Sequence, residues 1–180
     1  MSKKVLIIST SLRGGSNSDI LARECERGAK EAGHEVEYVS LKGKKINYCI
    51  GCLSCQTNGK CVLKDDAAEI MEKVRNAEAI VYATPIYYYE MAGQMKTLLD
   101  RLNPLFPCDY AFRDIYMIAT AAENDNGTFK KAYNGLKGWV DCFEKAELKG
   151  LVTGGGISAP NEAGNHKIAM QKSYELGKRL

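Results

Sequence analysis

Five short apolar runs alternate with longer segments whose apolar residues recur at helical spacing along this sequence of 180 residues. Runs rich in Val, Leu and Ile are typical of parallel strands that are covered on both faces. Their alternation with helical segments predicts a doubly wound α/β fold with a five-stranded parallel sheet. The strands are expected at Lys4–Ser9, His34–Leu41, Ala79–Thr84, Asp114–Thr120 and Leu148–Thr153.

The segments between these runs predict five helices. Asn17 or Ser18 can cap the first, which runs to about Ala32, and the acidic pair Asp65-Asp66 suits the start of the second. Pro85 is expected to end the third strand. No repeat, low-complexity tract or linker interrupts the pattern, so residues 1–180 are predicted to form one domain. The other helices are expected to end near Asn76 and to span Gly93–Leu102, Thr128–Ala146 and His166–Gly177.

Composition and charge exclude several classes of function. The net charge is only +3, and no basic run is interleaved with aromatic residues, so a nucleic-acid partner is not expected. The apolar run near Met1 is too short for a signal peptide or a membrane span, and a membrane partner is not expected either. A cytoplasmic protein is therefore expected. In that reducing compartment, clustered cysteines favour metal binding or redox chemistry over structural disulfides.

A hydroxyl-rich loop follows the first predicted strand. It contains Ser11, Arg13, two glycines, Ser16, Asn17 and Ser18, and it leads directly into a helix. Hydroxyls, glycines and the N–H groups at a helix start together form a cradle for an anion. The patterns GxxxxGK[ST] and GxGxxG are absent. The loop therefore favours a single terminal phosphate over a nucleoside triphosphate or a dinucleotide.

Two more loops lie where a doubly wound sheet binds its ligand, beyond the carboxyl ends of the strands. Pro85-Ile86-Tyr87-Tyr88-Tyr89 places three tyrosines in succession, and at least one ring is expected at the crevice beside a planar ligand. An aromatic run packed in a subunit interface is the alternative. The loop after the fourth strand, which contains Ala121, offers small residues and backbone donors to a ring edge. Gly154-Gly155-Gly156 follows the fifth strand and could approach a nucleotide, but it is interpreted as a simple turn.

Four of the seven cysteines, Cys49, Cys52, Cys55 and Cys61, lie in one short loop with the spacing C-x2-C-x2-C-x5-C. Four thiolates on such a loop are the ligand set of a [4Fe–4S] cluster. A zinc ion is a second interpretation, although zinc sites more often combine two separated C-x2-C pairs. Free thiols or a reversible disulfide, in a loop that covers the ligand site, are the third.

Three parts of the sequence together resemble the NADPH-dependent FMN reductase family of flavodoxin-like proteins. They are the hydroxyl-rich loop after the first strand, here called the phosphate loop, the segment Thr84–Tyr87 with Gly93–Lys96 and Leu98–Arg101, and the cysteine loop. Within that family, the cysteines are similar to those of the iron–sulfur flavoproteins. The resemblance implies a three-layer flavodoxin-like sandwich with strand order 2-1-3-4-5. It also implies non-covalent FMN and a homodimer or homotetramer. Asp100 and Arg101 are expected to order their helix and its neighbours.

The same resemblance assigns roles in cofactor binding. Ser11, Arg13, Ser16, Asn17 and Ser18 would hold the FMN phosphate, and Pro85, Ile86, Tyr87, Tyr88 and Tyr89 would border the ribityl chain and the ring. The expected function is an oxidoreductase that passes electrons from NAD(P)H through FMN to an acceptor, with the cluster as a further carrier. An electron-carrier protein without small-molecule turnover is the alternative. In either case the chemistry belongs to the flavin, and no catalytic acid or base is expected.

Overall fold

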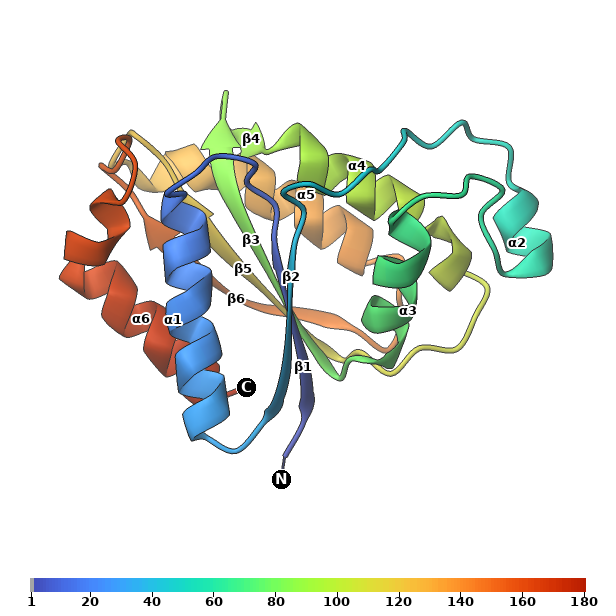
Figure 1. Cartoon of the computed structure of the whole chain (residues 1–180), viewed down its shortest axis with the longest axis horizontal. Helices are drawn as coiled ribbons and strands as arrows, with labels where there is room; N and C mark the ends of the chain where they lie inside the picture. The colour runs from blue at the N-terminus through green and yellow to red at the C-terminus, as the bar shows by residue number, and fades with distance from the viewer. Residues whose placement is uncertain (1) are drawn as a thin grey trace.

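The computed structural model describes residues 2–180, apart from the side chain of Asn126. Five long strands form a parallel sheet in the order β2-β1-β3-β5-β6, and the β5–β6 pairing shifts its register by one residue between Ile115 and Tyr116 (Figure 1). This confirms the flavodoxin-like fold class and the order 2-1-3-4-5 of the long strands. The strands are β1 (Lys4–Ser9), β2 (Glu35–Ser40), β3 (Ala79–Tyr87), β5 (Asp114–Thr120) and β6 (Glu147–Gly154).

Helices cover both faces of the sheet. Two of them, α1 (Asn17–Glu31) and α6 (Lys167–Lys178), pack on one face, while α3 (Ala67–Asn76), α4 (Gly93–Arg101) and α5 (Lys130–Val140) cover the other (Figure 1). The sheet therefore separates two hydrophobic cores, which is why its central strands are apolar on both sides. Short helical segments complete the chain: α2 (Ser54–Asn58), η1 (Asn103–Leu105), η2 (Asn126–Phe129) and η3 (Glu162–Asn165).

The sheet has six strands, not the five that were predicted. Strand β3 does not end at Thr84 but continues through Pro85 to Tyr87, and β4 (Glu90–Met91) folds back against it as an antiparallel hairpin. Pro85 is tolerated because its fixed extended φ suits a strand and because it lies near the end of the ladder, opposite Thr120.

Helix α5 ends at Val140, so the predicted extent to Ala146 is wrong. Beyond Val140 the chain turns, with Phe143 N–H donating to the Val140 carbonyl. The turn carries the Phe143 ring into a cluster with Tyr110, Phe112 and Trp139, whose ring centroids lie 4.7 to 5.2 Å from it. Burial of this ring therefore outweighs continuation of the helix.

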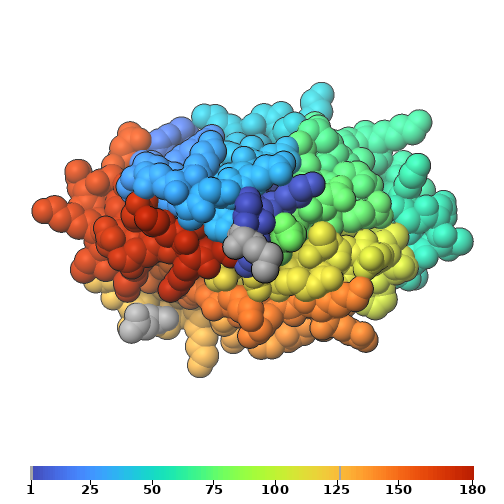
Figure 2. Space-filling model, turned by 90° about the horizontal axis from the view of Figure 1, so that it is seen from below, coloured from blue at the N-terminus to red at the C-terminus, as the bar shows by residue number. Residues whose placement is uncertain are grey.

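The fold gathers the loops that follow β1, β3, β5 and β6 at one edge of the sheet. Figure 2 views the molecule from below relative to Figure 1, from the side opposite this edge of the sheet. It shows the region of the cysteine loop (teal) and the C-terminal segment (red) at the two ends of the long axis. Within residues 2–180, no helix is both long enough and apolar enough to cross a membrane.

Candidate functional site

The loop after β1 ends at Ser16, which caps helix α1 in place of the predicted Asn17 or Ser18: its Oγ accepts a hydrogen bond from Asp19 N at 3.3 Å. The hydroxyls of Ser16 and Ser18 lie 3.1 Å apart, and both residues are buried. Asp19 N is taken by this cap, but the N–H groups of Asn17 and Ser18 precede it in the first turn, where a helix supplies no acceptor of its own, so they can face an anion beside Ser16. The residues of the predicted cradle therefore lie next to one another at the start of α1, and phosphate binding by them stays a prediction.

A segment far along the chain supports this loop. Arg13 Nη1 donates to the Ser158 carbonyl at 2.7 Å, and Asn17 Nδ2 donates to the Ala159 carbonyl at 2.9 Å. Asn17 Oδ1 in turn accepts from Ala163 N at 3.0 Å. The chain after β6 is therefore part of the site and more than the simple turn predicted at Gly154–Gly156.

A cavity of about 180 Å³ opens where these loops meet. It is lined by the phosphate loop, by the end of β3, and by the segments after β5 and β6. Eight of the predicted cofactor residues line it: Ser11, Arg13, Ser16, Asn17, Pro85, Ile86, Tyr87 and Ala121. Thr120 and Ala122, which flank Ala121 in the loop expected at the ring edge, also line it, and the residues that the sequence reasoning missed are Ile157 and Ser158.

Three predicted cofactor residues do not line the cavity. Ser18 lies behind the cradle and is fully buried. Tyr88 and Tyr89 form the tip of the β3–β4 hairpin, both with left-handed backbone (φ 50° and 68°). Tyr89 donates to Glu123 Oε1 at 3.2 Å, whereas Tyr88 is 97% exposed. Of the three tyrosines, Tyr87 is the one at the cavity.

The cysteine loop lies between β2 and α3 and contains the one-turn helix α2. Cys49 and Cys52 are exposed, Cys61 is half-buried, and Cys55 is buried with its Sγ accepting from Asn103 Nδ2 at 3.1 Å. All seven cysteines are free thiols. In the part of the chain that the structure describes, no three His, Cys, Asp or Glu side chains are gathered closely enough to hold a metal ion. The four thiols thus have the right chemistry for a metal but are not assembled around one point.

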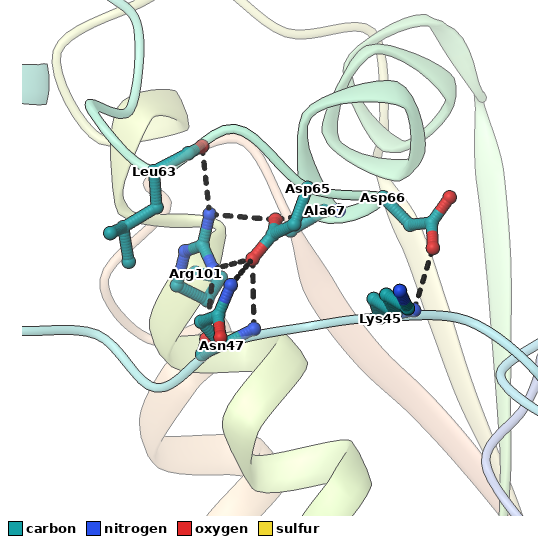
Figure 3. Close-up of polar contacts among 7 residues, drawn as sticks. All are labelled: Lys45, Asn47, Leu63, Asp65, Asp66, Ala67 and Arg101. Atoms are coloured by element: carbon teal, nitrogen blue, oxygen red, sulfur yellow. Dashed lines mark hydrogen bonds and ion pairs between the residues drawn. The ribbon is translucent and has the colours of Figure 1, made fainter.

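Both ends of the cysteine loop meet at a buried ion pair between Arg101 of α4 and Asp65 (Figure 3). Arg101 Nη1 lies 2.7 Å from Asp65 Oδ2, and the two side chains are 0% and 3% exposed. Burial alone would raise the pKa of Asp65, but hydrogen bonds from Arg101, Asn47 and Ala67 lower it to about 2. Burial likewise opposes the charge of Arg101, yet Asp65 and the nearby Cys61 sulfur leave the pKa of Arg101 above its ordinary value.

A flavodoxin-like sheet with a hydroxyl-rich loop and an aromatic strand end at the same edge is the arrangement in which flavodoxin-like proteins bind FMN. The family model of the NADPH-dependent FMN reductases matches residues 3–133. The chain therefore belongs to that family: it is a flavin-dependent oxidoreductase that uses FMN and a reduced nicotinamide nucleotide.

Individual proteins agree with the family. The chain is 41% identical to an iron-sulfur flavoprotein of Methanocaldococcus jannaschii, over 98% of this chain and 95% of the relative. It is 29% identical to an iron-sulfur flavoprotein of Methanosarcina thermophila, over 98% and 93% of the two chains. Among solved structures, an NAD(P)H:quinone oxidoreductase from Methanothermobacter marburgensis has a TM-score of 0.75 at 16% identity, covering 99% and 96% of the two chains, which shows the shared fold.

Proposed function

We propose that FMN binds in the cavity at the ends of β1, β3, β5 and β6, with its phosphate on the α1 cradle and its ring beside Tyr87. The observation that carries this proposal is the meeting of the two predicted segments in one cavity, since Ser11, Arg13, Ser16 and Asn17 line it together with Pro85, Ile86 and Tyr87. Bound FMN would take a hydride from NAD(P)H and deliver electrons to an acceptor.

The residues of the cradle fit a phosphate group. Ser11 and Ser16 supply buried hydroxyls, Arg13 supplies positive charge, and the start of α1 supplies N–H groups and the positive end of the helix dipole. Arg13 and Asn17 are held by carbonyl oxygens of the segment after β6, so the cradle is ordered before a ligand arrives. The protein's part in the reaction is to orient the cofactor and exclude water from the buried side of the cavity.

We propose further that Cys49, Cys52, Cys55 and Cys61 bind an iron–sulfur cluster. Two observations support this: the relative that is 41% identical is named an iron-sulfur flavoprotein, and thiolates on one loop are the required ligand set. Because Cys55 is buried while Cys49 and Cys52 are exposed, binding would draw the exposed part of the loop toward Cys55. Iron and acid-labile sulfide, assayed on protein purified without oxygen, test this part.

Anaerobic titration tests the reductase proposal against an electron-carrier protein without small-molecule turnover. Purified FMN-loaded protein is mixed with NADH or NADPH while the absorbance of the flavin is followed. Bleaching with either donor supports the reductase function and identifies the preferred nucleotide. No bleaching with either donor, in protein that holds a full complement of FMN, would favour the carrier.

A homo-oligomer is also proposed, as a dimer or a tetramer. The support is the tip of the β3–β4 hairpin, where Tyr88 exposes almost its whole ring next to the cavity-lining Tyr87. An exposed aromatic side chain of this kind is typical of protein contacts. Sedimentation equilibrium of the FMN-loaded protein measures the state, and a monomer at all concentrations would contradict the proposal.

A further inference from the structure

Arg101 joins the two ends of the cysteine loop with a single side chain. Its Nη1 donates to the Asn47 carbonyl at 2.8 Å, and its Nη2 donates to the Leu63 carbonyl at 3.4 Å. Asn47 precedes the first cysteine of the loop and Leu63 follows the last. The guanidinium therefore lies between the entry and the exit of the loop, as Figure 3 shows.

Asp65 completes this contact from the other side. It accepts from Arg101 at 2.7 Å on Oδ2 and at 2.9 Å on Oδ1, a two-pronged ion pair. The same carboxylate accepts from Asn47 N at 2.8 Å and from Asn47 Nδ2 at 2.9 Å. One residue further out, Lys45 N donates to Asp66 Oδ2 at 2.6 Å, and Asp66 N donates back to the Lys45 carbonyl at 3.1 Å. These contacts among Lys45, Asn47, Leu63, Asp65, Asp66 and Arg101 are here called the loop neck.

The chemistry of arginine explains why this residue stands at the neck. A guanidinium has a planar fork of five N–H donors, which can serve several acceptors at fixed angles, whereas a lysine ammonium is a compact charge on a flexible stem. A buried charge is tolerated only when it is paired and hydrogen-bonded, and here both side chains are almost completely excluded from solvent. Among the residues that the structure describes, the Nε of Arg101 has no hydrogen-bond partner, and Cys61 favours the charge of the guanidinium by raising its pKa.

We propose that Arg101 is a positioning residue for the four cysteines: it closes the loop neck and holds Cys49, Cys52, Cys55 and Cys61 in one short loop of fixed span. Closing the ends of a flexible loop costs conformational entropy, which a ligand gathering the thiols would otherwise have to offset. The neck offsets this cost within the folded protein. The part of this inference that concerns iron rests on the proposed cluster, while the part that concerns the closed neck does not.

Arg101→Lys tests the proposal, because it keeps the positive charge and removes the fork. FMN-loaded protein, purified without oxygen, is compared with wild type by amide hydrogen exchange and by iron and sulfide per FMN. We expect exchange in residues 45–66 to accelerate about ten-fold or more, as loss of a charge-assisted hydrogen bond would allow. Iron per FMN should fall at least several-fold, while the FMN content and the exchange of α1 stay at wild-type values.

Arg113→Lys is the matched control, since Arg113 also donates to backbone carbonyls, those of Tyr110, Ala111 and Phe112, but lies away from the neck. It should leave iron and exchange in residues 45–66 unchanged. If Arg101→Lys accelerates exchange throughout the protein, the same measurements on Asp65→Asn test the proposal instead, because this variant removes the carboxylate charge and keeps the shape of the side chain. Wild-type exchange at the neck, or iron retained at the level of an iron-containing wild type, in Arg101→Lys or in that case in Asp65→Asn, would overturn the proposal.

The two proposals fail in different ways. Wild-type protein that holds neither iron nor sulfide would sink the proposed cluster. Exchange in residues 45–66 would then still report on the neck, and acceleration in the Arg101→Lys protein would uphold its closure by Arg101. Iron present in wild type and retained in the variant would leave the cluster in place and refute the role of Arg101.

Discussion

Replacing Tyr88 by asparagine should stabilise the FMN-free monomer. Tyr88 and Tyr89 form the two-residue turn between the paired residues Tyr87 and Glu90, and both have positive φ. A two-residue hairpin with both φ values positive is a type I′ turn, for which Asn-Gly is strongly preferred. Left-handed backbone costs an ordinary side chain about 1 kcal/mol or more, and asparagine tolerates it better.

The magnitude follows from what the substitution leaves intact. Because Tyr88 is 97% exposed as a residue, removal of its ring forfeits almost no burial within the chain. The net gain should be about 0.5–1 kcal/mol, which for a chain of this size raises Tm by about 1–4 °C. Thermal unfolding is followed by circular dichroism on FMN-free protein, at two concentrations that differ ten-fold, so that any contribution from association is visible.

Tyr48→Asn is the control. Tyr48 is also strongly exposed, at 80%, but its φ is not positive, so asparagine relieves nothing there and Tm should change by about 1 °C at most. A Tm for Tyr88→Asn that equals the Tyr48→Asn value, or lies below wild type at both concentrations, would refute the reasoning. Since strained turns persist where function requires them, the same Tyr88→Asn protein should associate more weakly in sedimentation when loaded with FMN.

Three other substitutions test packing, acid stability and the phosphate cradle. A Cβ at Gly177 of α6 would lie 2.0 Å from the Cys25 carbonyl oxygen of α1, so Gly177→Ala should lower the free energy of unfolding in urea by about 3 kcal/mol or more. The control is Gly138→Ala, which has open space around it and should leave the free energy of unfolding unchanged or slightly higher. Because the pKa of Asp65 is lowered to about 2, its charge should add about 2 kcal/mol to the free energy of unfolding above pH 4, and this contribution is lost as the pH falls toward 2. Asp65→Asn should flatten this part of the dependence of stability on pH. Ser16→Ala should cost about 1 kcal/mol through the lost N-cap and weaken FMN binding in a fluorescence titration, with Ser16→Thr recovering most of both.

The elements predicted correctly are those whose causes lie close together in the sequence. The buried parallel strands follow from continuous apolar runs, and the start of α1 lies within one or two residues of the predicted cap because capping residues stand together at Ser16–Ser18. The errors have longer-range causes. Helix α5 stops early because Phe143 joins an aromatic cluster that includes Tyr110 and Phe112, and β3 runs past Pro85 because β4 folds back on it.

The support of the cradle illustrates the same limit within the site. Arg13 and Ser158 are 145 residues apart in the sequence, and Asn17 and Ala159 are 142 apart, so no local pattern announces either hydrogen bond. The available signal was the run of glycines after the fifth predicted strand, at an edge of the sheet where ligand-binding loops are expected. A Cβ at Gly155 would lie 2.9 Å from the Glu123 carbonyl oxygen, which shows that this run marks close packing between two loops of the site.

In the cysteine loop, the identity of the candidate metal ligands and the way in which the loop is closed are two separate properties, although both are easily inferred together from one sequence motif. The spacing of Cys49, Cys52, Cys55 and Cys61 indicates ligand chemistry, because thiol type and number can be read from adjacent residues. It does not indicate how the loop is closed, because the residue that joins its ends is Arg101 of α4, a helix that begins only after β3 and β4. A loop with the same four cysteines but without a buried fork at its neck would keep the ligands and lose their fixed span. If the proposed role of Arg101 holds, the ability of such a loop to hold a cluster depends on a contact outside the motif, and the pairing of Asp65 with Arg101 is the feature to seek beside it.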